Sequence, residues 1–138
     1  MATKLPVIKV VGVSASGKST LVKGLRGAGY DARPVSQEHS NVHDLWKQFG
    51  FPKVLIYLDA SLQVQRQRRP DVEWDEEARH GEIEKLADAL ENADLRVDTT
   101  ELTPPKVLHV ALAYLQNLGV RHAVEPLPPV PQTGSFAA

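Results

Sequence analysis

Gly12-Val-Ser-Ala-Ser-Gly-Lys-Ser19 joins a short apolar segment to an amphipathic one. Val7–Val11, before it, is a run of mostly β-branched residues, which predicts a buried strand. Residues 17–28, after it, repeat leucine and valine at helical spacing and are followed by Gly29, which predicts a helix and its end. The quoted residues fit the pattern G-x-x-x-x-G-K-[ST], in which glycines let successive backbone N–H groups turn inward at a helix N-terminus. A strand, such a turn and a helix together predict an anion-binding loop.

The side chains of this loop are those that bind a nucleoside triphosphate. Lys18 would reach the β- and γ-phosphates as a point charge, the Ser19 hydroxyl would ligate Mg²⁺, and Thr20 would add a contact to the α-phosphate. A Gly-rich turn has no structural need for a lysine followed by a hydroxyl residue. We therefore predict that ATP binds here with Mg²⁺, and that GTP is the less favoured nucleotide. The predicted nucleotide-binding residues are Gly12, Val13, Ser14, Ala15, Ser16, Gly17, Lys18, Ser19 and Thr20.

Strands and helices alternate along the rest of the chain. Further strands are predicted at residues 30–36, 53–58 and 95–98, and helices at 61–69, 75–92 and 104–118. Pro34 favours an edge position for the first of these strands. The alternation predicts an α/β fold with three layers (α/β/α) and a parallel sheet of about four to five strands. Ligands of such sheets bind at the carboxyl ends of the strands.

Length and composition limit the classes of protein to consider. The 138 residues predict one domain over residues 1–119 and a Pro-rich tail over 120–138, flexible or lying along the surface. A net charge of −1 argues against a nucleic-acid partner, and the absence of Cys excludes thiolate metal sites and a cysteine nucleophile. The sequence has no long apolar run and no signal-peptide pattern, so we expect no membrane partner and a cytoplasmic location.

The loop, including its Ala15, resembles the phosphate loop of uridine kinases and phosphoribulokinases, within the P-loop kinase superfamily. Val35-Ser-Gln-Glu-His-Ser40 is similar to the end of the following strand in those kinases, where an acidic residue stands at the position of Glu38. The resemblance implies that Glu38 accepts the proton of the substrate hydroxyl or holds Mg²⁺ through water. The segment from Gln37 to Pro52 is shorter than the region that holds the acceptor in those kinases, so the acceptor site is either small or missing.

Leu55-Ile-Tyr-Leu-Asp59, with the arginine-rich residues after it, resembles the strand and lid entry of nucleoside and nucleotide kinases. In those kinases one arginine stacks on the base and others touch the transferred phosphate. The resemblance implies catalytic roles for Arg66 and Arg69, although spacing does not settle which arginine does which. The alternative is a solvated basic stretch that pairs with the acidic residues 71–77.

Several residues keep two interpretations. Asp59 competes with Glu38 as the base or the Mg²⁺ partner, and either Asp59 or Ser61 would cap the next helix. His39, His43 and Asp44 are candidates for acceptor binding, with zinc as the lesser alternative. Trp46 and Phe49 either line an acceptor pocket or pack in the core.

Three functions fit these residues. The first is a small-molecule kinase that transfers a phosphoryl group from Mg-ATP to a hydroxyl or phosphate acceptor, which the sequence does not identify. The second is a nucleotide-binding accessory protein, because residues 29–40 also resemble the second strand of the GTP-binding accessory protein of molybdopterin guanine dinucleotide synthesis. The third is a degenerate kinase that senses nucleotide without transfer.

Overall fold

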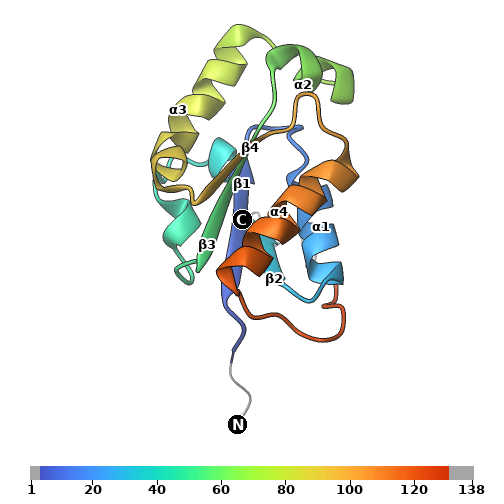
Figure 1. The fold of residues 1–138 in the computed structure, drawn as a ribbon. Helices are drawn as coiled ribbons and strands as arrows, with labels where there is room; N and C mark the ends of the chain where they lie inside the picture. Colours follow the sequence, from blue (N-terminus) through green and yellow to red (C-terminus); the bar gives the residue numbers. More distant parts are fainter. Residues whose placement is uncertain (1–3, 131–138) are drawn as a thin grey trace.

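The computed structural model describes residues 4–130. Within them, one parallel sheet has the strand order β2-β1-β3-β4 (Figure 1). The strands are β1 (Val7–Gly12), β2 (Asp31–Pro34), β3 (Val54–Asp59) and β4 (Leu95–Asp98). The predicted α/β class and parallel sheet are confirmed, with four strands, and Pro34 lies on an edge strand as expected. The strand order runs outward in both directions from β1, so the ligand-binding crevice of such a sheet is expected at its carboxyl end.

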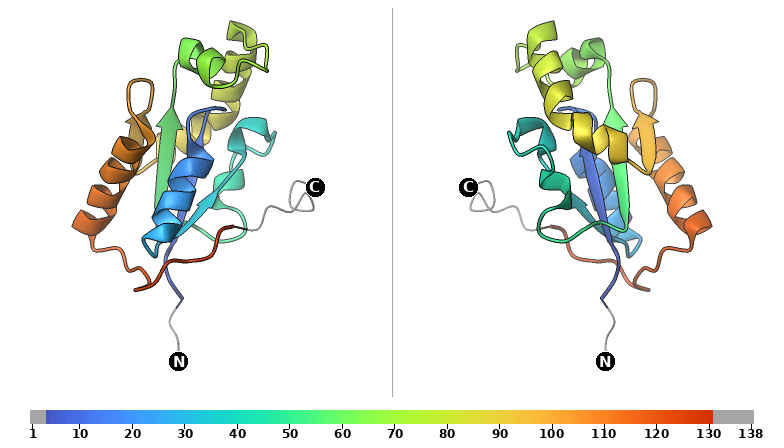
Figure 2. Two further views of the ribbon diagram at one scale, coloured as in Figure 1. Left: turned by 90° about the vertical axis from the view of Figure 1, so that its right-hand side faces the viewer. Right: turned by 90° about the vertical axis from the view of Figure 1, so that its left-hand side faces the viewer.

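Helices cover both faces of this sheet. The elements outside it are α1 (Lys18–Gly27), η1 (Gln37–His39), η2 (Leu45–Lys47), α2 (Leu62–Arg68), α3 (Glu76–Asn92) and α4 (Pro104–Leu118). Figure 2 shows α1 and α4 on one face, and α3 with the two short 3₁₀ helices on the other. α2 lies beyond the carboxyl ends of the strands, next to the start of α3. The three layers follow from right-handed crossovers, which place α1, between β1 and β2, and α3, between β3 and β4, on opposite faces.

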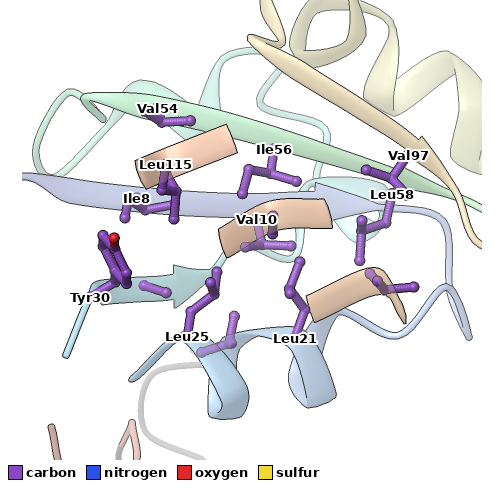
Figure 3. Close-up of a cluster of buried hydrophobic side chains, with 14 of the residues drawn as sticks. Ile8, Val10, Leu21, Leu25, Tyr30, Val54, Ile56, Leu58, Val97 and Leu115 are labelled. Atoms are coloured by element: carbon purple, nitrogen blue, oxygen red, sulfur yellow. The ribbon is translucent and has the colours of Figure 1, made fainter. Parts of the chain in front are cut away.

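Alternation along the two central strands builds the core on the α1–α4 face. Ile8 and Val10 of β1, and every second residue of β3, point to this face and pack against α1 and α4 (Figure 3). Leu25 from α1 and Leu115 from α4 are fully buried there. Burying one such leucine contributes roughly 1.5–3 kcal/mol, so this cluster fixes α1, and with it the residues just before α1.

The opposite face of β1 is less apolar than Val7–Val11 suggests. Lys9 is only 5% exposed and its Nζ donates to the carbonyl oxygen of Gln48 at 2.7 Å. Burial, with a smaller contribution from Arg33, lowers the pKa of Lys9. The lysine therefore ties the central strand to the loop between η2 and β3.

The buried stripe of α3 differs from the predicted one. Helical spacing places Ile83, Leu86, Ala87 and Leu90 toward the core, but Ala87 is exposed. The buried positions are Leu86, which the pattern predicts, together with Ala89 and Glu82, whose exposure is 6%. Glu82 is part of the buried stripe because its carboxylate accepts hydrogen bonds from Ser14 in the loop that follows β1, which the apolar pattern does not reveal.

The ends of the helices mostly follow the sequence signals. The Ser61 hydroxyl accepts from the Val64 N–H at 3.2 Å and caps α2, and the Asp75 carboxylate accepts from the Ala78 N–H at 2.7 Å and caps α3. α4 begins with Pro104, but Thr103 forms no side-chain cap. No helix in residues 4–130 is long and apolar enough to cross a membrane.

Residues 120–130 lie along the surface, while residues 131–138 of the predicted tail are outside the described residues. The Ala123 N–H donates to the Gly29 carbonyl at 2.8 Å, and the Leu127 N–H donates to the Arg26 carbonyl at 2.8 Å. A Cβ on Gly29 would lie 2.1 Å from the carbonyl oxygen of Ala123. The segment therefore docks on the turn between α1 and β2, where only glycine fits.

Candidate functional site

The loop between β1 and α1 is shaped by two glycines and a strained alanine. A Cβ on Gly12 would lie 2.2 Å from the backbone oxygen of Leu58, so β1 and β3 approach closely at their carboxyl ends. Ala15 and Gly17 have φ angles of 63° and 100°, both left-handed, and Gly17 faces open space. Such turns aim backbone N–H groups at a common point. The loop therefore has the shape of an anion site at the N-terminus of α1.

Lys18 folds back over this loop. Its Nζ donates to the carbonyl oxygens of Gly12 at 2.9 Å and Val13 at 3.1 Å, and lies 2.7 Å from Oε2 of Glu38. The two charged side chains are 12% and 4% exposed. The structure thus brings together Lys18 and Glu38, two residues that sequence reasoning treated separately.

One carboxylate oxygen of Glu38, Oε1, is buried and forms no hydrogen bond with residues 4–130. His39 is 62% exposed, and its Nε2 lies 3.7 Å from Oε2 of Glu38. A buried acceptor without a donor is destabilising, and native proteins keep few of them. Glu38 is therefore suited to accept a donor from a ligand or water.

A second buried acid, Glu82, which the sequence did not single out, forms hydrogen bonds with the loop between β1 and α1. The Glu82 carboxylate accepts from both the backbone N–H, at 3.2 Å, and the hydroxyl of Ser14. The Gln65 amide donates to the Ser14 carbonyl oxygen at 2.9 Å and to Glu82 at 3.3 Å. The sequence carries no signal for this role, because the apolar spacing of α3 points to a stripe that leaves Glu82 out, and only the structure shows that Glu82 is buried.

The three arginines near α2 have different partners. Arg68 donates to the Ala15 carbonyl oxygen at 2.8 Å and to the hydroxyl and carbonyl of Thr99 at 3.0 and 2.6 Å. Arg66 bonds to the carbonyl oxygen of Trp74 at 2.9 Å, and Arg69 pairs with the neighbouring Asp71 at 2.8 Å. Among the described residues, Arg68 is the one of these three that bonds to the loop between β1 and α1, and the catalytic roles of Arg66 and Arg69 stay predictions.

Asp59, the alternative to Glu38 as the base or the Mg²⁺ partner, already has hydrogen-bond partners. Its Oδ1 accepts from the Ala60 N–H at 2.8 Å and from the Arg79 guanidinium at 3.3 Å. Burial, and then the nearby Asp59 carboxylate, raise the pKa of Tyr57 to about 12. The helix cap that sequence assigned to either Asp59 or Ser61 belongs to Ser61.

Two pockets open at this end of the molecule. The first, of about 260 Å³, lies beside α4 and the loop after β4; it is lined by Ser16, Gly17, Thr20, Arg68, Leu102 and Pro104, among others. The second, of about 560 Å³, lies between η1 and the start of α3; it is lined by Glu38, His39, Trp74, Asp75, Glu77, Ala78, Gly81, Glu82 and Lys85. The loop residues Ser16 and Gly17 line the first pocket, and Glu38, the partner of Lys18, lines the second.

The remaining candidates lie elsewhere. Trp46 is buried and its Nε1 donates to Asp88 at 2.8 Å, whereas Phe49 is 94% exposed, so neither lines the second pocket. His43 is exposed. Within residues 4–130, no group of three or more His, Asp and Glu side chains is arranged to hold a metal ion.

Comparison with known proteins identifies the fold. No protein-family model matches the chain, and no curated protein matches it. Its fold is similar to that of shikimate kinase from Acinetobacter baumannii in complex with shikimate, with a TM-score of 0.56 over 85% of this chain and 96% of that one. The two sequences are 14% identical. The likeness shows the fold alone, a parallel sheet with helices on both faces, and it does not support the features specific to uridine kinases.

Proposed function

We propose that this protein is a small-molecule kinase, which transfers a phosphoryl group from Mg-ATP to a hydroxyl group. The observation that carries the proposal is the pairing of Lys18 with a buried Glu38 at 2.7 Å, beside a glycine-containing loop in which Ala15 and Gly17 have positive φ angles. The lysine supplies charge for the phosphates, and the carboxylate supplies a base for the acceptor. The fold, which is similar to that of a kinase, and the two pockets support the same conclusion.

The nucleotide would lie along the loop and into the smaller pocket. The triphosphate binds Lys18 and backbone N–H groups of the loop other than those of Ser14 and Ser16, which donate to Glu82 and to the Val13 carbonyl oxygen. To reach the phosphates, Lys18 leaves the carbonyl oxygens of Gly12 and Val13. The base occupies the pocket of about 260 Å³, whose wall combines the apolar Leu102 and Pro104 with the guanidinium of Arg68. A guanidinium stacks well on an aromatic base, so Arg68 is the arginine we assign to that role. Arg66 and Arg69 would reach the phosphates only after exchanging their present partners.

The residues at the loop fit a magnesium ion. Ser19 stands in the first turn of α1 with an exposed side chain, and the unpaired Oε1 of Glu38 would hold an ion through water. Asp59 is the less suitable ligand, because its carboxylate already accepts from Arg79. When bound, Mg²⁺ neutralises charge that develops on the transferred phosphoryl group.

The transfer step needs one base and no covalent intermediate. The acceptor oxygen attacks the γ-phosphorus, the bond from that phosphorus to the β-phosphate oxygen breaks, and the electron pair leaves on ADP. The acceptor proton passes to Glu38. Catalysis of this kind depends on positioning and on charge stabilisation.

Calorimetric titration with ATP and GTP, each with and without Mg²⁺, tests the proposal. We expect Mg-ATP to bind the natural protein and the Lys23→Ala variant, because Lys23 is exposed on the same helix, and to lose affinity for Lys18→Met. Far-UV circular dichroism verifies that each variant is folded. If neither nucleotide binds the natural protein, the proposal fails; if Mg-GTP alone binds, the accessory-protein alternative replaces it.

A further inference from the structure

The pocket of about 560 Å³ has walls of one dominant charge. Four of the nine residues that line it carry carboxylates (Glu38, Asp75, Glu77 and Glu82), against one ammonium group, Lys85. Three of these carboxylates have partners within the protein. Glu38 pairs with Lys18, Asp75 accepts from the N-terminus of α3, and Glu82 accepts from Ser14. Of these partners only Lys18 is a cation, so the pocket keeps a negative potential.

Two buried polar atoms on this wall lack partners. Oε1 of Glu38 is a buried acceptor and Nε1 of Trp74 is a buried donor, and neither forms a hydrogen bond with residues 4–130. Glu38 and Trp74 both line the pocket, so a ligand bound there is suited to supply their missing partners. A hydroxyl group can donate to a carboxylate or accept from an indole N–H, so each of these atoms suits a hydroxylated ligand.

We propose that the acceptor of the phosphoryl group is a small alcohol that carries an amine, such as an amino sugar or an amino alcohol. The inference rests on the proposed kinase function and names its substrate class. The hydroxyl group donates to Glu38, and the ammonium group lies toward Glu77 and Asp75, which line the same pocket.

Anionic acceptors fit this pocket poorly. A carboxylate or phosphate needs cationic donors, above all the paired N–H groups of arginine, and no arginine is among the nine residues that line it. Lys85 alone would face four carboxylates. Placing like charges together in a binding site is strongly unfavourable, so charge alone separates acceptors of equal size.

A matched set of acceptors tests the inference on the full chain. D-Glucosamine, D-glucose and D-glucuronate share one ring and differ in charge. We expect Mg-ATP-dependent formation of ADP and sugar phosphate with glucosamine, and calorimetric binding of glucosamine to protein loaded with a non-hydrolysable ATP analogue. Serinol, glycerol and glycerate form the same series on a smaller skeleton.

A charge reversal at Glu77 tests the role of the pocket charge, and the same change at Glu76 is its control. In Glu77→Lys, the half-saturating concentration of the amine should rise about tenfold, and that of the anion should fall. Glu76→Lys changes the neighbouring exposed residue, which does not line the pocket, and should leave both unchanged. Preference for the anions, equal use of the three charges, or binding of none of the amines to nucleotide-loaded protein would each overturn the inference. Absence of nucleotide binding would instead overturn the kinase proposal beneath it.

Discussion

Removing the charge of Lys18 should destabilise the protein even when no nucleotide is present. Lys18→Met keeps the aliphatic stem but leaves the Glu38 carboxylate 4% exposed, with Oε1 already unpaired. Its nearest remaining cation is His39, whose Nε2 is 3.7 Å away and which is charged only if protonated. Losing one partner of a buried pair typically costs roughly 3–5 kcal/mol. Because Lys18 is 12% exposed and water can reach the site, we expect the free energy of unfolding to fall by about 3 kcal/mol. That is a large share of the roughly 5–15 kcal/mol by which a typical protein is stable.

The reverse substitution should cost less. In Glu38→Gln, Lys18 keeps the carbonyl oxygens of Gly12 and Val13 as acceptors, so its charge stays hydrogen-bonded. We expect a loss of about 1 kcal/mol, near the net value of one hydrogen bond. The double variant Lys18→Met/Glu38→Gln contains no buried unpaired charge, so it should be more stable than Lys18→Met alone.

Urea unfolding of the four proteins, followed by far-UV circular dichroism at pH 7, measures this cycle. The coupling energy between the two positions should be at least about 1 kcal/mol, above the roughly 0.3–0.5 kcal/mol scatter for independent sites. Equal stabilities of Lys18→Met and the natural protein, or additive effects in the double variant, would show that the pair is not formed in the free protein.

Two further predictions concern β1 and β3. Gly12→Ala places a Cβ 2.2 Å from a backbone oxygen and should lower the free energy of unfolding by about 1–3 kcal/mol; Gly27→Ala, with open space around its Cβ, should be neutral or stabilising, and similar urea midpoints would refute the clash. The pKa of Tyr57 is raised to about 12, so the phenol of the unfolded chain ionises at lower pH than that of the folded protein. The contribution of this phenol to stability is therefore complete below pH 10, and the free energy of unfolding falls by about 2–3 kcal/mol as pH rises through 12. Tyr57→Phe should lack that loss; parallel stability curves over pH 9–12 would contradict it.

Element types were predictable because their signals are local. β4 and the α2–α4 boundaries came within about a residue of those observed, since caps, prolines and apolar spacing act over a few residues. Ser61 and Asp75 cap their helices for the same reason. The prediction of a phosphate-binding role for the loop between β1 and α1 likewise depends only on its own eight residues and the elements on either side.

The rest of the site depends on contacts between distant residues. Glu82 lies 68 positions after Ser14, and Arg68 lies 53 positions after Ala15. Nothing in the local sequence separates Arg68 from Arg66 or Arg69; the geometry of α2 relative to the loop does. Lys9 and Glu82 look like solvated charges by residue type, and their burial follows from the acceptors and donors that the fold brings to them.

The docking of residues 120–130 on the turn after α1 also sets an order of events on the ribosome. Arg26 bonds to the carbonyl oxygen of Pro128, 102 positions later in the chain. At roughly 5–20 residues per second, the ribosome takes about 5–20 s to make that stretch. Throughout that interval the carbonyl oxygen of Gly29 lacks the Ala123 N–H from which it accepts in the folded protein, although β1 and β2 have already been made. The nascent protein completes this edge only when its last described segment leaves the exit tunnel.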